Sequence, residues 1–160
     1  MNKVYTRNQS RSYPTKIDGS KYVTIFCDAS HDHGSGASGY GFWIKHGSPA
    51  TTVKVGGSFR CAGSSKAEEI AILESLKYAI SNIDLVGKCI VISSDCVPAM
   101  QATDLSILPK CIESFKFKHV PGHKGVTSPC SAVNTWCDRE AKRQMRSLRD
   151  GVSLGEEDGN

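Results

Sequence analysis

Acidic residues stand at places in this 160-residue chain where several carboxylates could act together. Asp28 and Asp95 each end an apolar run, "YVTIFCD" and "CIVISSD", and Glu68 and Glu69 are adjacent at the start of a helical pattern. A further acid, Asp138, lies within the last helical pattern. Carboxylates that converge repel one another and need a cation to coexist, and oxygen ligands of this kind select Mg²⁺ or Mn²⁺. The acids therefore predict a divalent metal site that acts on a phosphate-containing substrate.

Each acid also has a purely structural interpretation. Aspartate favours loop starts and helix N-caps, and acids in a first helical turn suit the positive end of the helix dipole. Of the two glutamates, Glu68 stacks over Ala71 and Ile72, where an apolar stripe begins. Glu69 lies only about 100° further round the helix, so helical spacing alone leaves open which glutamate faces a site.

The elements that position these acids follow from the hydrophobic patterns. We predict strands over 21–28, 39–47, 51–59, 88–95 and 115–120, and helices over 64–83, over 97–105 and from about Ser131 to 150. The short connections between the first three strands predict an antiparallel meander, and the apolar run at 88–95 is typical of a strand buried on both faces. The order β-β-β-α-β-α-β-α predicts one α/β domain over 21–150. We expect a flexible basic leader at 1–20 and a disordered acidic tail at 151–160.

The helix expected over 64–83 has a clear core face and a serine cap. Its apolar stripe consists of Ala71, Ile72, Leu76, Ala79 and Ile83. Ser64 or Ser65 can act as the N-cap, and Ser65 together with Glu68 fits a capping box.

Five short motifs resemble those of the type 1 ribonuclease H family: "FCDAS", "AEEIA", "ISSDC", "VPGHKG" and "NTWCDREA". They occur in the family's order and on the element types that the family has there, and the resemblance covers residues 21–147. It implies an α/β, ribonuclease H-like fold. In that fold a five-stranded mixed sheet, with three antiparallel strands followed by two parallel strands, is flanked by helices.

The resemblance also implies a catalytic centre. The family's acidic quartet, which is catalytic and holds the metal ions, falls on Asp28, Glu68, Asp95 and Asp138. The family's first-helix motif has an alanine three residues after the catalytic glutamate. Ala71 stands at that spacing from Glu68, so the resemblance favours Glu68 over its neighbour.

Other positions of the family's site also have counterparts. His123 resembles a mobile catalytic histidine that assists proton transfer or product release, and its alternative is an exposed loop histidine between glycine-rich neighbours. Asn134 resembles a position that orients the site, and its alternative is helix capping. The nucleic-acid-binding residues that the resemblance implies are Ser30, Ser64, Ser65, Lys124, Asn134 and Arg139.

The activity implied by the resemblance is endonucleolytic cleavage of the RNA strand of an RNA–DNA hybrid. It uses two Mg²⁺ ions, with Mn²⁺ as a substitute, and leaves 3′-hydroxyl and 5′-phosphate ends. Two departures weaken the match to a hybrid. Ser64, Ser65 and Val97 replace two asparagines and a glutamine that contact the hybrid in many family members, and the chain between Asp95 and His123 is too short for a basic helical handle. The alternatives are a nuclease of the same fold for single-stranded or branched DNA, and a nucleic-acid-binding module without turnover.

The charge distribution is consistent with a polyanionic partner. The net charge is +4, and residues 110–149 carry nine lysines and arginines against three acids. Such a basic segment suits nucleic acid, and the alternative is an ordinary solvated helix surface.

The cysteines and the hydropathy indicate the compartment. The seven cysteines form no C-x-x-C pair, which favours reduced thiols over a zinc site or disulfides. No apolar run reaches the roughly 20 residues that span a bilayer. We expect a cytoplasmic monomer, with the nucleus or an organelle left open.

Overall fold

The computed structural model describes residues 21–120 and 129–151 of the chain. Its strands are β1 (Tyr22–His31), β2 (Ala37–His46), β3 (Thr51–Arg60), β4 (Cys89–Ser94) and β5 (Ser114–His119), and its helices are α1 (Ser64–Asn82), α2 (Val97–Ala102), the 3₁₀ helix η3 (Leu105–Ile107) and α3 (Pro129–Asp150). The predicted order of strands and helices is confirmed, with η3 as an addition. The helix expected over 97–105 ends at Ala102, because Asp104 caps η3 by accepting a hydrogen bond from the backbone N–H of Ser106.

The five strands form one mixed sheet in the order β3-β2-β1-β4-β5. β1 pairs antiparallel with β2, and β2 pairs antiparallel with β3, so the predicted meander is confirmed. β4 lies parallel to β1 on the other side, and β5 lies parallel to β4. The predicted α/β fold class, with three antiparallel strands followed by two parallel strands, is confirmed.

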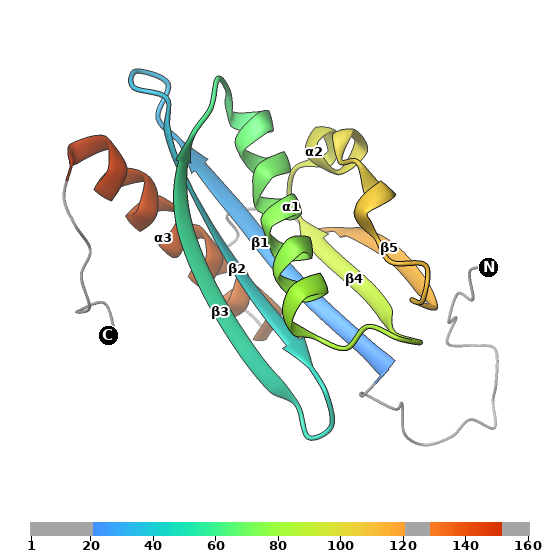
Figure 1. Ribbon diagram of the computed structural model, residues 1–160. Helices are drawn as coiled ribbons and strands as arrows, with labels where there is room; N and C mark the ends of the chain where they lie inside the picture. Colours follow the sequence, from blue (N-terminus) through green and yellow to red (C-terminus); the bar gives the residue numbers. More distant parts are fainter. Residues whose placement is uncertain (1–20, 121–128, 152–160) are drawn as a thin grey trace.

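Helices cover both faces of the sheet (Figure 1). The main core lies between the sheet and α1, and its members include Ile25, Phe42, Ile72, Leu76 and Ile92. α3 packs on β2, β1 and β3. Because successive residues of a strand point to opposite faces, Phe42 contacts the α1 side while its neighbour Gly41 faces α3.

Two glycines of β2 let α3 lie directly on the sheet. A Cβ atom on Gly41 would lie 2.8 Å from the carbonyl oxygen of Cys137, and one on Gly39 would overlap the backbone of Ala141 and Met145. Side chains at these positions would push the helix away, so the glycines fix the distance between β2 and α3. Because α3 carries Asp138, this packing also sets how close that acid comes to β1.

Two expectations about local structure were wrong. The N-cap of α1 is Gly63, which has an extended backbone and makes no side-chain cap hydrogen bond, and Ser64 is already the first helical residue. The capping box fails because Glu68 is directed into a buried acidic site. β4 is buried on both faces only towards its end: Ser93 and Ser94 are buried, whereas Val91 is half-buried because α3 lies mainly over β1 to β3.

Candidate metal and nucleic-acid site

Asp28 and Asp95 are brought together by the register of β1 and β4. The parallel ladder between the two strands ends at the pair Phe26–Ser93, and each aspartate stands two residues further along the chain, Asp28 within β1 and Asp95 directly after β4. Both aspartates are displaced by the same number of residues from the last pair of the ladder, so they lie at the same end of the sheet. Because neighbouring strands lie about 4.8 Å apart, their carboxyl groups come close together there. Ligand sites of α/β sheets gather at this carboxyl end of the parallel strands.

Glu68 completes a compact group of three acids. It lies in the second turn of α1, among the buried residues Ala67, Ala71 and Ile72 that pack on the sheet. One oxygen from each of Asp28, Glu68 and Asp95 lies within 4.8 Å of the others. The Oε1 atom of Glu68 is buried and has no hydrogen-bond partner.

Burial and mutual repulsion disturb the titration of this group. Burial raises the pKa of Glu68 to about 10, with further increases from the charges of Asp28 and Asp95. Burial likewise raises the pKa of Asp28 to about 7, although its Oδ1 accepts a 2.9 Å hydrogen bond from the backbone N–H of Ala29. Acids held in this way favour either protons or a bound cation.

Glu69 has different surroundings from those of Glu68. Its Oε1 lies 3.4 Å from the ammonium nitrogen of Lys66, an exposed residue in the first turn of α1. The neighbouring glutamates therefore separate into a member of the acid group and a partner of a surface lysine. This geometry favours Glu68, as the family resemblance does.

Asp138 lies near the acid group but is not a member of it. Its negative charge contributes to the raised pKa of Asp28, behind burial and the charge of Asp95. Its Oδ2 atom forms a 3.1 Å ion pair with the ammonium nitrogen of Lys142, one turn further along α3. The structure thus joins three of the four expected acids and pairs the fourth with a lysine. This role of Lys142 was not predicted from the sequence, although the four-residue spacing between Asp138 and Lys142 is typical of such an ion pair on a helix.

The positions predicted to contact nucleic acid come from different elements around the acid group and differ in exposure. Ser64 and Ser65 are exposed at the N-terminus of α1, and the Ser65 side chain also contacts the Cys96 thiol beside Asp95. Ser30 is half-buried on β1, two residues beyond Asp28. On α3, Asn134 is half-buried one turn before Asp138, and Arg139 is exposed. His123 and Lys124 lie outside the described residues.

The cysteines next to the acids are packing groups. Burial, with the neighbouring negative charges, raises the pKa of Cys27 and of Cys137, so both thiols stay protonated. The Cys137 thiol donates to the carbonyl oxygen of Phe26 at 3.4 Å, which ties α3 to β1. The described cysteines, which exclude Cys130, are free thiols.

The chemistry of the donors fits a hard divalent cation. Three carboxylates with oxygens this close offer the ligands that Mg²⁺ and Mn²⁺ prefer. The buried Glu68 Oε1 has no protein group to satisfy it, and a cation would supply the missing partner. Asp28, Glu68 and Asp95 are thus the residues that could hold a metal, with Asp138 at the edge of the site.

These features define an α/β protein with a carboxylate cluster at the ends of two adjacent parallel strands. Its structure is similar to the N-terminal ribonuclease H domain from Mycobacterium tuberculosis, solved as a fusion with maltose-binding protein, with a TM-score of 0.61 and 18% identity over 84% of this chain and 100% of that chain. It is also similar to ribonuclease H1 from the archaeon Halobacterium salinarum, with a TM-score of 0.55 and 18% identity over 81% and 98% of the two chains. A third similar structure is LC11-RNase H1 in complex with an RNA/DNA hybrid, with a TM-score of 0.57 and 15% identity over 79% and 99%.

The comparisons show the fold of this chain. No protein-family model matches it, and no curated protein does. The chain has the ribonuclease H-like fold, and the predicted resemblance to type 1 ribonuclease H is confirmed at that level. In the part of the chain that the structure describes, no helix is both long enough and apolar enough to cross a membrane.

Proposed function

We propose that this protein is a metal-dependent endonuclease that hydrolyses the RNA strand of RNA–DNA hybrids and leaves 3′-hydroxyl and 5′-phosphate ends. The observation that carries the proposal is the convergence of Asp28, Glu68 and Asp95 within 4.8 Å, with a buried and unpartnered oxygen on Glu68. The similarity in fold to solved ribonuclease H structures supports the same reading.

The acids would hold two divalent ions, Mg²⁺ with Mn²⁺ as a substitute. When bound, such ions activate a water molecule and stabilise the leaving oxygen of a phosphodiester. Asp28 and Asp95, fixed at the ends of paired strands, would set the position of the scissile phosphate, and Glu68 would close the site from α1. Asp138 would add negative charge from α3 while Lys142 balances it. His123 remains the proposed group for proton transfer or product release.

Contacts to a hybrid would come from polar groups around the acids. The exposed hydroxyls of Ser64 and Ser65 can bond to a ribose 2′-hydroxyl, which distinguishes RNA from DNA. Ser30 and Asn134 would orient the strand near the acids. Arg139 and the loop residue Lys124 would bind phosphates, which give affinity without reading sequence.

One observation supports a second candidate, a nuclease of this fold that cuts single-stranded or branched DNA. Val97, at the position where many ribonucleases H carry a glutamine, is 40% exposed beside the acid group. A valine side chain cannot donate or accept a hydrogen bond, so part of the hybrid recognition is missing. A binding module without turnover is the third candidate, and the grouped acids argue against it.

A panel of labelled substrates tests the proposal. The purified protein is incubated with Mg²⁺ or Mn²⁺ and hybrid, double-stranded RNA, double-stranded DNA, single-stranded DNA or a branched DNA junction. We expect cleavage of the hybrid RNA strand, and its loss in Asp95→Asn. Preference for a DNA-only junction would favour the second candidate. Metal-dependent hybrid binding without cleavage of any substrate would favour the third.

We further propose that the protein acts as a monomer in a reducing compartment, the cytoplasm in the first instance. Sedimentation of the purified protein would test the oligomeric state. A dimer at micromolar concentration would contradict it.

A further inference from the structure

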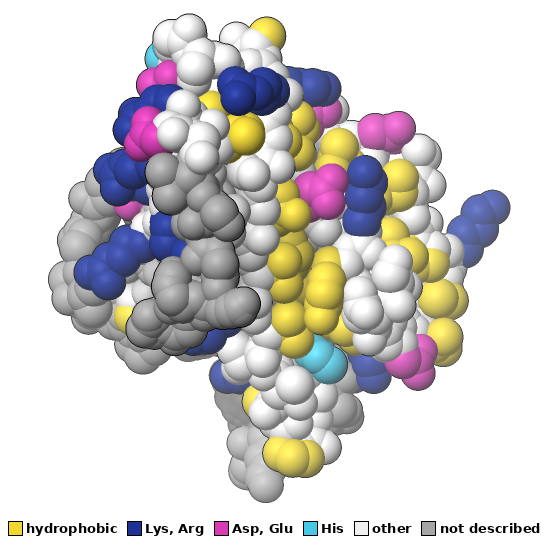
Figure 2. All heavy atoms as spheres, turned by 60° about the vertical axis from the view of Figure 1, so that its left-hand side comes forward, with side chains coloured by type: hydrophobic (Ala, Val, Ile, Leu, Met, Phe, Trp, Pro, Cys, Tyr) yellow, Lys and Arg dark blue, Asp and Glu magenta, His cyan; other side chains and the backbone are white. Residues whose placement is uncertain are grey.

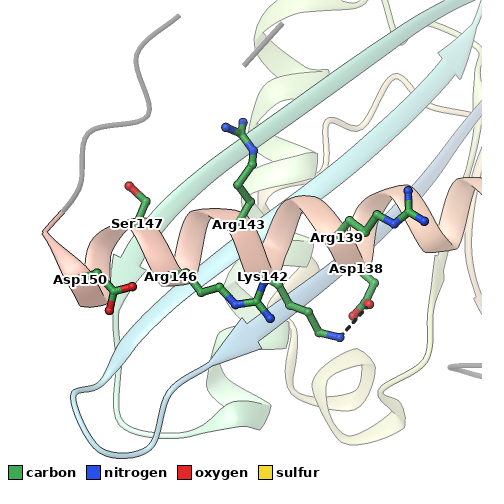
Figure 3. Close-up of a pocket in the computed structure, with 7 residues that line it drawn as sticks. All are labelled: Asp138, Arg139, Lys142, Arg143, Arg146, Ser147 and Asp150. Carbon is green, nitrogen blue, oxygen red and sulfur yellow. Dashed lines mark ion pairs between the residues drawn. The ribbon is translucent and has the colours of Figure 1, made fainter. Parts of the chain in front are cut away.

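The outward side of α3 carries a row of positive side chains that starts beside Asp138, at the edge of the acid group. A hollow of about 670 Å³ runs along this side. It is lined by Asp138, Arg139, Lys142, Arg143, Arg146, Ser147 and Asp150 (Figure 3). We call its four cations, Arg139, Lys142, Arg143 and Arg146, the α3 basic face. Lys and Arg side chains also gather at the left-hand side of the view in Figure 2.

The four cations differ in how far they are already neutralised. Arg143 donates twice, at 2.9 Å each, to the carboxylate of Glu140, and is held by that pair. Lys142 is paired with Asp138. Arg139 and Arg146 are exposed and form no ion pair among the residues that the structure describes.

The acids on this side form their ion pairs with other cations, although the hydrogen bond from Arg149 and, to a lesser extent, the charge of Arg146 lower the pKa of Asp150. Asp150, at the far end of the hollow, forms its 2.9 Å ion pair with Arg149. Asp138 is engaged by Lys142 at the near end. The free positive charge of the α3 basic face therefore lies on Arg139 and Arg146.

The α3 basic face is long enough to contact several phosphates of a nucleic-acid backbone. Figure 3 shows Lys142 and Arg146 extending along the same side of α3 as Asp138. Arg146 is eight residues beyond Asp138, so the face reaches about 12 Å along the helix from the fourth acid. A duplex rises 3.4 Å per base pair, so this length corresponds to about three or four base pairs. A single phosphate would occupy only part of it.

We propose that the α3 basic face is a second contact site for the substrate, which binds backbone phosphates of the duplex from beside Asp138, at Arg139, to about three or four base pairs away, at Arg146. This inference rests on the proposed function, because it places a nucleic acid at the acid group. The occupant is a duplex backbone because the face is continuous with a site whose chemistry is directed at a phosphodiester. Exposed guanidinium groups bind phosphate oxygens in a fork and carry no base preference. The face would also supply substrate contacts in a chain whose connection from Asp95 to His123 is too short for a basic helical handle.

The test measures binding instead of cleavage, in an Asp95→Asn background that keeps the hybrid intact. The variant Arg139→Gln/Arg146→Gln is compared with Lys77→Gln/Lys110→Gln, which removes two exposed positive charges from α1 and from the β4–β5 connection. Fluorescence anisotropy gives the Kd of a labelled hybrid over a range of salt concentrations. Each phosphate contact releases about 0.9 counterion, and Arg139→Gln/Arg146→Gln removes two such contacts. Between about 50 and about 200 mM salt, the affinity of the parent should therefore fall by about tenfold more than the affinity of this double variant. The control pair should keep the parent's salt dependence.

A second hybrid locates the contact. Its central phosphates are intact, and the linkages further out are uncharged methylphosphonates. The parent should bind this hybrid more weakly than the all-phosphate hybrid, whereas Arg139→Gln/Arg146→Gln should bind both alike, because the two changes remove the same interaction. Equal discrimination by parent and variant would overturn the proposal, as would an equal loss in the control pair.

The outcome is separable from that of the proposed function. Failure of the unmodified protein to cleave any substrate would sink the proposed function and leave this binding result valid. If the unmodified protein cleaves the hybrid but the salt dependence of the Kd is unchanged in Arg139→Gln/Arg146→Gln, the proposed contact site is wrong and the proposed function stands. Circular dichroism melting of both double variants identifies any loss of binding that is due to unfolding.

Discussion

Asp28 and Glu68 form an uneven pair of partly buried carboxyl groups. Burial, followed by the charge of Asp28, raises the pKa of Glu68 to about 10. Burial also raises the pKa of Asp28, but only to about 7, and a hydrogen bond with Glu68 is among the interactions that oppose this increase. At neutral pH Glu68 therefore holds a proton in the absence of metal, and Asp28 is near its midpoint. A cation that binds there displaces protons.

The first prediction concerns stability against pH without metal. Both acids bind protons more tightly in the folded protein than in the unfolded chain, whose values are near 3.8 and 4.5. The folded state therefore binds more protons, and the free energy of unfolding falls as pH rises. The contribution of Asp28 falls from about pH 4 to about 7, and that of Glu68 continues to fall to about 10. Thermal melts in EDTA from pH 5 to pH 9 should show a decreasing Tm.

Neutral variants isolate these two groups from the rest of the titration. Asp28→Asn and Glu68→Gln should each flatten the decrease of Tm with pH, and Glu69→Gln should keep it. Added Mg²⁺ should raise the Tm of the unmodified protein more at pH 8.5 than at pH 5.5, because the ligands must lose protons to bind. If the Tm of the unmodified protein in EDTA rises with pH relative to the Tm of both neutral variants, the assigned directions of the two pKa shifts are wrong.

The second prediction separates the adjacent glutamates. Glu68→Gln should lower kcat on the preferred substrate by about a hundredfold or more, because it removes a carboxylate that would hold the ions that activate water and stabilise the leaving oxygen. Glu69→Gln removes only a pair with an exposed lysine, worth at most about 1 kcal/mol, and should stay within about twofold of the parent. Single-turnover cleavage assays measure both. The reverse order of effects would assign the site to Glu69.

The third prediction concerns Asp138, which stands outside the group of three acids and is paired with Lys142. Because it contributes mainly charge at the edge of the site, Asp138→Asn should reduce activity by about 10-fold to 100-fold, less than Asp95→Asn. Its main effect should be a higher Mg²⁺ concentration for half-maximal cleavage. A metal titration of the cleavage rate for both variants decides this. An equal and complete loss in both would place Asp138 among the primary ligands.

The fourth prediction concerns the contact between β2 and α3. A Cβ at residue 39 would overlap backbone atoms of Ala141 and Met145, which cannot rotate away. Gly39→Ala should therefore cost about 1 to 3 kcal/mol, and each kcal/mol lowers the Tm by about 2 to 4 °C in a domain of this size. Gly34→Ala is the matched control, since its nearest neighbour would be the flexible Asp32 side chain at 3.7 Å. Equal melting temperatures for the two variants would show that α3 shifts at little cost.

Much of the fold was predictable because its signals are local. Alternating and continuous apolar runs marked the five strands, and helical spacing marked α1, whose residues Ala71, Ile72, Leu76 and Ala79 are all buried as expected. The N-cap of α1 was not predictable in the same way. A serine-to-glutamate capping box is a local rule, and it was overridden at Gly63 because Glu68 is directed into the acidic site.

The sequence by itself determined which acids were available and on which kind of element each would lie. Asp28 and Asp95 were expected at strand ends, and Glu68 or Glu69 at the start of a helix. These expectations were possible because the hydrophobic periodicity of the few residues around each acid indicates the type of element there. Whether those acids meet depends on contacts between distant segments. The stagger of β1 against β4 aligns the two aspartates, and the packing of α1 on the sheet selects Glu68.

Only the tertiary structure decided the position of the fourth acid. The distance at which α3 lies over Gly39 and Gly41 leaves Asp138 beside the three-acid group and paired with Lys142. The same packing turns Arg139 and Arg146 outward. Charge counts along the chain indicate a basic segment, but the rotation of a helix against a sheet decides which charges face solvent, because that rotation is set by side-chain packing across the whole interface.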